Sequence, residues 1–409
     1  MFINVSHNLK KLSTYFPENL YVVGGYVRNQ ILKIKSSDVD LASSVDIEEV
    51  SKRLKETDYS VKVKNISTGS LLISKDDEKY EYTAFRRDVY SQNGSHMPIR
   101  IERTNKLEED AIRRDFSINA IYYNINKDEV ADFYHGIIDL KDKVIRTLAD
   151  PEDVLRFDGE RILRLVRIAG ELDFTIEKQT LKSAKKHVEN IKNISGSRKF
   201  KEIEKILYCD KRYDLGKQSL KNALEVLNKL GVWRIFDFSK NKIKYQQVYK
   251  VEDRFFGLLI DIINTQKPAC LQDFVERLLA EFDIEEKLAK KIYIHLAGYY
   301  DALGGMNNKE FFLKYFEEWS HIYLLLGAKS KRIQTNYNFF YRYIIEHGLV
   351  IKVSDLKIGK DDIKESFPEI DARCYDRILH ELLSKVFDGG LANKKKDLLV
   401  EILKNKQKY

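Results

Sequence analysis

The spacing of apolar residues changes once along this 409-residue chain, near Pro151. Before that point, short β-rich runs such as LYVVG, DVDLAS, GSLLISK, YEYTAF and FSINAIYYN alternate with helical patterns such as IEEVSKRLKE. After it, apolar residues recur at helical intervals, as in ILRLVRIAGEL and DFVERLLAEF. The sequence therefore predicts an α+β protein, with an α/β head followed by a long all-helical part.

Charge and hydropathy limit the location and the partners. The net charge of +8 and the pI near 8.9 favour a polyanionic partner. The first residues lack the pattern of a signal peptide, and no apolar run reaches the roughly 18 residues that span a bilayer. We expect a cytoplasmic protein without a membrane partner. The cysteines Cys209, Cys270 and Cys374 lie far apart, which argues against a disulfide framework or a structural zinc site.

A glycine turn follows the first predicted strand. Gly24 and Gly25 come after YVV, and the residues YVRNQIL can begin a helix. Glycines at a strand-to-helix turn let backbone N–H groups approach a phosphate. Arg28, one helical turn later, can reach the same oxygens. A glycine pair by itself is usually only a turn, so the prediction of phosphate binding depends on what surrounds it.

Two carboxylates stand one residue apart shortly after this turn. Residues i and i+2 of a strand point to the same face, so Asp38 and Asp40 would present their carboxylates side by side. Two unpaired like charges are costly there, and a magnesium ion would remove the cost. A pair of loop aspartates is the alternative for an isolated D-x-D. The glycine turn and the arginine nearby favour a nucleotide site.

The combination GGYVRN and DVD resembles the first motif of the class II tRNA nucleotidyltransferase and poly(A) polymerase family, within the DNA polymerase beta nucleotidyltransferase superfamily. RRDFSINA is similar to the second motif of this family, and DGERILRLVRIAGELDF to its E-D-x-x-R motif. ISGSRKFKEIEKIL resembles the neck helix, and VFDGGLANKKKDLL resembles the tail of the bacterial CCA-adding enzymes. The matches run in family order from residue 21 to about 400.

The resemblance implies roles for particular residues. Arg113 would contact the incoming nucleotide, while Asp115 and Asn119 would shape its pocket. Gly25 and Arg28 would hold phosphate, and Asp38 and Asp40 would be the catalytic ligands of Mg²⁺. The alternative for the RRD sequence is a structural ion-pair cluster, which fits Arg114 better than Arg113.

The residues Asp158 and Arg161 are predicted to select the base. Three residues apart on a helix, they would be neighbours on one face. A carboxylate accepts hydrogen bonds and a guanidinium donates them. Cytosine and adenine each present an amine beside an unprotonated ring nitrogen, whereas uracil and guanine would leave buried polar groups unpaired. An ordinary i, i+3 surface salt bridge is the alternative.

Arg164 and Arg167 continue this series at intervals of three. Each step turns the helix by about 300°, so the four side chains are not expected to face one point. We expect Arg164 to reach the nucleotide, and the resemblance implies that Arg167 does so too. Glu81, on the predicted strand YEYTAF, is either a third carboxylate near the metal or a solvent-facing residue.

Two positions depart from the family pattern. Asn29 replaces the usual aspartate after the arginine, which we expect to change only local hydrogen bonding. Phe157 replaces the glutamate of the E-D-x-x-R motif, close to the predicted base-selecting pair. Residues 86–102 resemble the flexible loop that full CCA-adding and A-adding enzymes retain, which disfavours CC-only addition.

The sequence thus predicts a template-independent nucleotidyltransferase that adds C, C and A to the 3′ end of tRNA from CTP and ATP. Poly(A) polymerase or A-only addition stays open, as does an inactive RNA-binding protein. No protein partner is implied. The lysine-rich end of the chain predicts either a solvated helix face or tRNA binding. The expected domains are a catalytic head (1–145), a neck with the nucleotide-selecting helix (146–210), a body (211–345) and a tRNA-binding tail (346–409).

Overall fold

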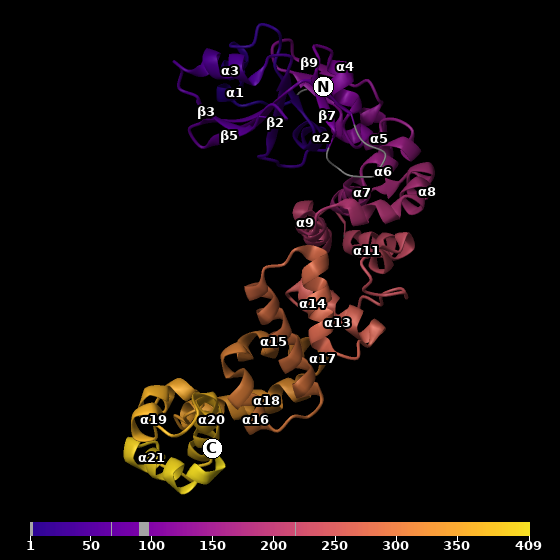
Figure 1. Ribbon diagram of the computed structural model, residues 1–409. Helices are drawn as coiled ribbons and strands as arrows, with labels where there is room; N and C mark the ends of the chain where they lie inside the picture. The colour runs from indigo at the N-terminus through magenta and orange to yellow at the C-terminus, as the bar shows by residue number, and fades with distance from the viewer. Residues whose placement is uncertain (1–2, 67, 90–97, 217) are drawn as a thin grey trace. The chain divides into compact units, whose positions relative to one another are not determined.

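The computed structural model describes residues 3–66, 68–89, 98–216 and 218–409. Within these residues the chain forms two compact units. The first holds residues up to Lys244, with Asn264–Lys267 and Leu278–Ile284. The second holds Tyr245–Ile263, Pro268–Arg277 and Glu285–Tyr409. The predicted α+β class is confirmed, because a mixed-sheet head is followed by helices, which fill the orange and yellow part of Figure 1. The four domain boundaries expected from the sequence stay a prediction.

A seven-stranded mixed sheet is the centre of the head. Its strands lie in the order β3-β4-β5-β2-β1-β8-β9. The strand β1 runs antiparallel to β2 and β8, whereas β2 and β5 are parallel. The strands are β1 (Tyr21–Val23), β2 (Val39–Ser43), β3 (Ser60–Asn65), β4 (Ser70–Lys75), β5 (Glu78–Ala84), β8 (Tyr122–Asn124) and β9 (Glu129–Ala131). Two smaller pairs are β6 (Arg86–Val89) with β7 (Arg100–Arg103), and β10 (Val144–Ile145) with β11 (Thr175–Ile176).

The strand β2 carries a polar start into a buried end. Leu41, Ala42 and Ser43 are buried, whereas Asp40 is exposed. Asp40 lies opposite Val23 of β1 on one side and Glu81 of β5 on the other. The apolar half of β2 therefore anchors the strand in the core, and its first residues are held at the edge of that core.

Helices α2 and α3 of the first unit contact the sheet, and further helices follow it in the chain. The helix α6 begins with Pro151 in its first turn, where Asp150 accepts a hydrogen bond from the Glu152 backbone N–H at 2.9 Å. The helices of this unit are α1 (His7–Ser13), α2 (Gly25–Ile31), α3 (Ile47–Leu54), α4 (Leu107–Ile112), α5 (Gly136–Asp142), α6 (Pro151–Phe157), α7 (Glu160–Leu172), α8 (Lys178–Lys186), α9 (Gly196–Leu207), α10 (Cys209–Tyr213), α11 (Ser219–Leu230) and α12 (Val232–Ile235). The helix α7 is almost surrounded by protein, since Ile162, Leu163 and Leu165 are fully buried.

The second unit is helical throughout its described residues. An aromatic cluster that includes Phe311, Phe312, Trp319 and Tyr337 lies in its core. Its helices are α15 (Glu286–Leu303), α16 (Asn308–Tyr315), α17 (Trp319–Lys329), α18 (Lys331–Glu346), α19 (Lys360–Ser366), α20 (Tyr375–Phe387) and α21 (Lys395–Lys404). Two further helices, α13 (Arg254–Gln266) and α14 (Leu271–Phe282), contribute residues to both units. Among the described residues, no helix is long and apolar enough to cross a membrane.

The run FSINAIYYN differs from its prediction as one strand. Only Tyr122–Asn124 is a strand, while Ser117–Asn119 forms a short 3-10 helix, η1. The Ser117 backbone N–H donates to the Arg146 carbonyl, and the Ser117 hydroxyl donates to Asp139. The Ser117 N–H thus finds its partner in a distant segment next to the Phe116–Thr147 bridge and not in the main sheet, because buried backbone groups need partners wherever they lie.

Candidate functional site

A highly charged cavity of about 890 Å³ opens in the first unit. All nine residues predicted to form the site line it: Gly25, Arg28, Asp38, Asp40, Arg113, Asp158, Arg161, Arg164 and Arg167. Eleven basic and seven acidic side chains take part in the lining, which gives the cavity a positive balance. It suits a polyanionic ligand of nucleotide size.

The glycine turn lies directly beside the carboxylate pair. Gly24 has a φ of +78°, a conformation that L-residues with a side chain rarely adopt. A Cβ atom at this position would lie 3.2 Å from Oδ2 of Asp40. A residue other than glycine would therefore be strained and would crowd the carboxylate. Gly25 is the first residue of α2, as the sequence predicted for the helix start.

Asp38 and Asp40 both face the cavity, but their surroundings differ. The Asp38 side chain is 79% exposed and accepts a hydrogen bond from Arg212 Nη2 of α10 at 3.1 Å. Asp40 lies at the open cavity, yet the surrounding protein displaces part of the water around its carboxylate, and this desolvation raises its pKa. Arg114 opposes the increase, whereas Glu81 and Asp38 add to it. A cation at this pair would relieve the cost of the Asp40 charge.

A divalent metal fits this pair through few protein ligands. The described residues contain no group of three or more His, Cys, Asp or Glu side chains placed to hold a metal ion. Magnesium is commonly held by one or two carboxylates, with phosphate oxygens and water as its other ligands. Glu81 pairs with Asp40 in the sheet, but its carboxylate bonds Lys64 at 2.5 Å and is not part of the cavity lining.

Arg113 and Arg114 share one buried carboxylate that the sequence analysis missed. Asp110 of α4 is fully buried and accepts from Arg113 Nε at 2.8 Å and Arg114 Nη2 at 3.3 Å. It also accepts from the Tyr122 hydroxyl at 2.5 Å. Burial by itself would raise the pKa of Asp110, but the two guanidinium groups outweigh it and lower that pKa. An ion-pair cluster therefore holds both arginines, not Arg114 alone.

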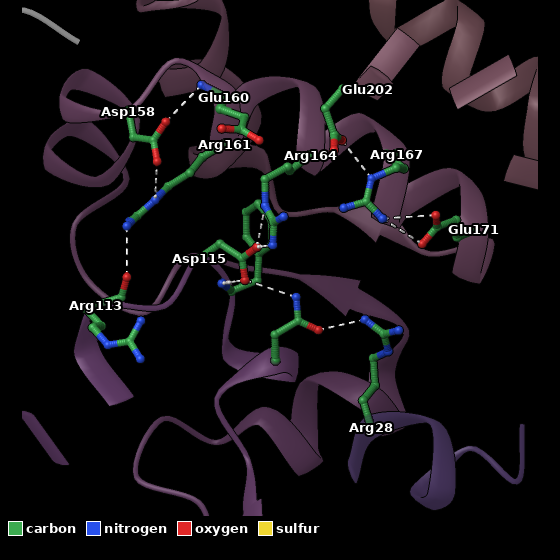
Figure 2. Close-up of polar contacts among 12 residues, drawn as sticks. Arg28, Arg113, Asp115, Asp158, Glu160, Arg161, Arg164, Arg167, Glu171 and Glu202 are labelled. Atoms are coloured by element: carbon green, nitrogen blue, oxygen red, sulfur yellow. Dashed lines mark hydrogen bonds and ion pairs between the residues drawn. The ribbon is translucent and has the colours of Figure 1, made fainter. Parts of the chain in front are cut away.

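Asp115 joins the head to helix α7. Its Oδ2 atom accepts from Arg164 Nε at 2.9 Å, and its Oδ1 atom accepts from the Asn119 amide at 3.0 Å (Figure 2). Asp115 is buried, which would raise its pKa, but Arg164 and the Asn119 bond hold the pKa well below its usual range. Asn119 in turn accepts from Arg28 Nη1 at 2.7 Å. This amide thus fixes the orientation of two charged groups at once.

The pair Asp158 and Arg161 forms as expected, but not on one helix. Asp158 is the residue after α6, in an extended conformation, and α7 starts only at Glu160. Its Oδ2 atom accepts from Arg161 Nε at 3.2 Å, and its Oδ1 atom accepts from the Glu160 backbone N–H at 2.9 Å. Arg161 Nη2 also donates to the Arg113 carbonyl at 2.9 Å (Figure 2). Both side chains are almost buried.

A close backbone contact lies next to the break between α6 and α7. Gly159 packs against the backbone of the segment around Asn190, so that an added Cβ would lie 2.3 Å from the Asn190 carbonyl oxygen. Such an approach requires glycine. The prediction that Asp158 and Arg161 lie on one helix was wrong, because Asp158 is extended and its carboxylate accepts a hydrogen bond from the Glu160 backbone N–H at the start of α7.

Arg164 and Arg167 line the same cavity as Asp158 and Arg161, although they lie on separate turns of α7. Arg167 donates to Glu202 of α9 at 2.7 Å and to Glu171 at 3.0 Å. Two buried carboxylates thus occupy its guanidinium, which links α7 to α9 (Figure 2). Contact of Arg167 with a nucleotide stays a prediction.

The two departures from the family pattern occupy different places. The half-buried Phe157 lies outside the main cavity and lines a smaller one of about 360 Å³, together with Arg113 and Arg161. Asn29 lines the main cavity and contacts Arg28. In the predicted flexible loop, residues 90–97 lie outside the described residues.

Family models match two stretches of the chain. Residues 20–146 match the "Poly A polymerase head domain", and residues 173–215 match the "Probable RNA and SrmB- binding site of polymerase A". The resemblance predicted from the motifs is therefore confirmed for these stretches. Nucleotidyltransferases of this kind generally use a divalent metal.

Curated relatives share about half of their length with the chain. A CCA-adding enzyme of Bacillus velezensis is 35% identical over 203 residues, which are 50% of this chain and 49% of the relative. A CCA-adding enzyme of Streptococcus thermophilus is 37% identical over 188 residues, or 46% of this chain and 45% of the relative. The chain thus spans about half the length of the curated relatives it matches.

Solved structures share the fold along nearly the whole chain. The CCA-adding enzyme of Bacillus stearothermophilus in complex with CTP has a TM-score of 0.72 at 19% identity, covering 98% of this chain and 97% of that one. The Thermotoga maritima CCA-adding enzyme complexed with tRNA-CCA has a TM-score of 0.61 at 19% identity, covering 98% and 96%. At this identity the likeness shows the fold alone.

Proposed function

We propose, on the premise that residues 20–146 belong to the poly A polymerase head domain family, that this chain is a template-independent tRNA nucleotidyltransferase. It adds C, C and A to the 3′ end of tRNA from CTP and ATP and releases pyrophosphate. The observation that carries this proposal is the single cavity in which the carboxylate pair, the glycine turn and the Asp158–Arg161 pair meet. Relatives named CCA-adding enzyme support it.

Asp38 and Asp40 are the proposed magnesium ligands and hence the catalytic residues. Magnesium, when bound, supplies charge neutralisation at the triphosphate and activation of the RNA 3′-hydroxyl. The protein contributes side chains and backbone groups that are held in fixed positions around the substrate. Gly24 lets the turn pass within contact distance of Asp40, and Arg28 and Arg113 are held at the cavity wall by partners that leave them little freedom. A phosphate chain placed along this wall faces preorganised cations.

Asp158 and Arg161 are the proposed base-selecting pair. The pair sets an acceptor beside a donor, the pattern that cytosine and adenine share on their Watson–Crick edges. Bonds to the Glu160 N–H and the Arg113 carbonyl hold its two members from opposite sides. Because both side chains are nearly buried, a base with the opposite pattern would leave polar groups unpaired, at about 1 to 3 kcal/mol each. Arg164 and Arg167 complete the proposed nucleotide-binding set.

The proposed RNA partner is the 3′ end of tRNA. The positive balance of the whole chain and of the cavity supports binding to a phosphate backbone. A tRNA substrate agrees with the cytoplasmic location expected from the sequence. The lysine-rich residues after 346 are proposed to add contacts to the tRNA backbone.

Single-nucleotide incorporation tests the proposal. Purified protein is incubated with Mg²⁺ and with tRNAs that end before C74, C75 or A76, with each labelled triphosphate in turn. We expect C on the first two substrates and A on the third, with UTP and GTP rejected. Addition of A alone, or of long A tracts, would indicate the A-adding or poly(A) alternative. Binding of tRNA without any incorporation would indicate an inactive RNA-binding protein.

A further inference from the structure

Arg28 differs from the other arginines of the cavity. Nine arginines line it, and eight of them form an ion pair with a carboxylate within the described chain: Arg86, Arg113, Arg114, Arg161, Arg164, Arg167, Arg198 and Arg212. Among the described residues, Arg28 has no carboxylate within ion-pair distance. It is also nearly buried, at 5% exposure.

Neutral oxygens hold the Arg28 guanidinium instead. Nε donates to the Asn29 amide oxygen at 3.0 Å, Nη1 donates to Asn119 at 2.7 Å, and Nη2 donates to the Tyr213 hydroxyl at 3.3 Å. Asn29 closes the network, because its amide nitrogen donates to the same hydroxyl at 3.2 Å. The guanidinium is thus oriented on three sides by neutral groups, and the nearby carboxylates of Asp115 and Glu171 act on it only from beyond contact distance. In Figure 2, the dashed line that ends at Arg28 marks the bond that its Nη1 donates.

This arrangement is costly unless an anion completes it. Burial lowers the pKa of Arg28, which is the expected cost of holding a charge away from water. A carboxylate at position 29 would relieve the cost, since it would lie directly beside Nε. The chain has an amide there, which keeps the hydrogen bond and omits the charge.

We propose that Asn29 and Tyr213 are positioning residues that orient Arg28 at the cavity wall while leaving its charge for the triphosphate of the substrate. The inference depends on the proposed function for the identity of the anion. Tyr213 is the last residue of α10, so the network also ties the turn after β1 to a helix that follows it by nearly 200 residues.

The experiment measures anion binding directly, by calorimetry with inorganic tripolyphosphate and with CTP, and thermal unfolding of each variant. Asn29→Asp introduces a carboxylate beside Arg28. We expect binding of tripolyphosphate to weaken about tenfold, or about 1.4 kcal/mol, because Arg28 is then neutralised internally. We expect the same variant to unfold at a higher temperature, because a buried charge gains a partner.

A second test variant, Tyr213→Phe, and two controls, Gln30→Glu and Tyr26→Phe, accompany Asn29→Asp. Gln30→Glu adds the same charge at the next residue of α2 and should change tripolyphosphate binding less than twofold, since only a screened long-range repulsion acts there. Tyr213→Phe removes the acceptor of two hydrogen bonds, and we expect about a fivefold loss of tripolyphosphate affinity with a rise in KM for CTP and little change in kcat. Tyr26→Phe removes a hydroxyl that bonds only the Asn4 carbonyl and should have no such effect.

The outcomes separate the inference from the proposed function. If the unmodified protein binds CTP and tripolyphosphate but Asn29→Asp binds them equally well, the positioning role is wrong and the function stands. The inference is also wrong if Asn29→Asp and Gln30→Glu weaken binding equally, because the effect is then one of net charge alone. If the unmodified protein binds tripolyphosphate but incorporates no nucleotide, the proposed function fails, and the comparison of variants still decides the role of Asn29.

Discussion

Positive charge is organised in opposite ways in the cavity of the first unit and in the lysine-rich end of the second. Around the cavity, the arginines Arg113, Arg161 and Arg167 have side chains only 10–14% exposed, and carboxylates fix them. At the chain end, Lys395, Lys406 and Lys408 also pair with carboxylates, but their side chains are 42–61% exposed. The basic side chains of this protein therefore form two kinds of ion pair, which are buried around the cavity and exposed at the chain end.

The difference lies in what each kind of pair can do. Exposed ion pairs contribute about 0 to 1 kcal/mol, because water and salt compete with them. They can give way to an RNA phosphate at little cost. A broken buried pair costs about 3 to 5 kcal/mol, so its geometry persists. Selection of a nucleotide needs buried pairs with a fixed geometry, whereas contact with a long polyanion needs only exposed pairs.

The largest expected effect comes from the carboxylate pair. Asp38→Ala or Asp40→Ala should lower the rate of nucleotide addition by a thousandfold or more, about 4 kcal/mol, because the proposed metal ligands are lost. Single-turnover incorporation measures the rate, while circular dichroism and tRNA binding check that the protein is folded. A variant that keeps more than about a tenth of the rate would contradict the proposed metal role.

The next effect compares an ion pair whose carboxylate is buried with a pair that is exposed on both sides. Asp115→Asn should lower the free energy of unfolding by about 3 kcal/mol at neutral pH, because Arg164 loses its partner. Asp371→Asn, which breaks the exposed pair with Arg373, should change it by less than about 0.5 kcal/mol. Urea unfolding of both variants gives the comparison. Equal losses would mean that burial does not distinguish the two pairs.

The pH dependence of Asp115 follows from its lowered pKa. A carboxyl whose pKa is lower in the folded state stabilises the fold above its unfolded pKa, about 3.9. That stability is lost as the pH falls through the folded value. We therefore expect the stability difference between the unmodified protein and Asp115→Asn to be full at pH 6 and to shrink steadily below about pH 4. Urea unfolding across this range would contradict the lowered pKa if the difference stayed constant.

Base selection should respond by a smaller factor. Arg161→Ala should impair CTP and ATP together, and Asp158→Ala should do likewise with weaker rejection of UTP. Each lost buried contact costs about 1 to 3 kcal/mol, or a five- to hundredfold change in kcat/KM. Incorporation assays with all four triphosphates measure this. Loss of ATP use alone in Arg161→Ala would place base selection elsewhere in the cavity.

The smallest effect concerns the chain end. Lys394, Lys396 and Lys404 form no ion pair within the described chain, so replacing all three by Gln should weaken tRNA binding several-fold. It should also lower the salt slope of binding by about 2 to 3. The matched variant replaces the paired Lys395, Lys406 and Lys408 and should weaken binding less. Unchanged binding in the first variant over a salt titration would assign these lysines to solvation alone.

The sequence predicted the members of the site better than their contacts. The glycine turn follows β1 and the D-x-D spans the start of the adjacent strand β2, with Asp38 just before the strand, and both could be predicted because their spacing is local. The partners of Arg28 and Asp115 could not be read, because Asn119 and Arg164 follow them by 91 and 49 residues. Nothing local marks which of many polar residues will meet across a fold.

Two local signals were misread or overlooked. Asp110 lies three and four residues before two arginines, a spacing that predicts ion pairs on a helix, and it was overlooked in favour of the arginines. Asp158 was placed on the helix of Arg161 because the two residues are three apart, yet Asp158 is extended and its carboxylate caps the start of α7. A spacing of three is compatible with a helix but does not show at which residue the helix begins.

The close approach of Gly159 to the backbone at residues 190 and 191 limits which substitutions position 159 can accept during evolution. The neighbours that fix it are main-chain atoms of Asn190 and Ile191, which every amino acid possesses. The side chains at 190 and 191 have constraints of their own, since the Asn190 amide donates to the Arg156 carbonyl and Ile191 is fully buried. Position 159 is constrained differently, because it tolerates no methyl group although glycine has no side-chain chemistry. The proposed selection of the base by Asp158 therefore depends on a neighbouring residue that lacks a Cβ atom.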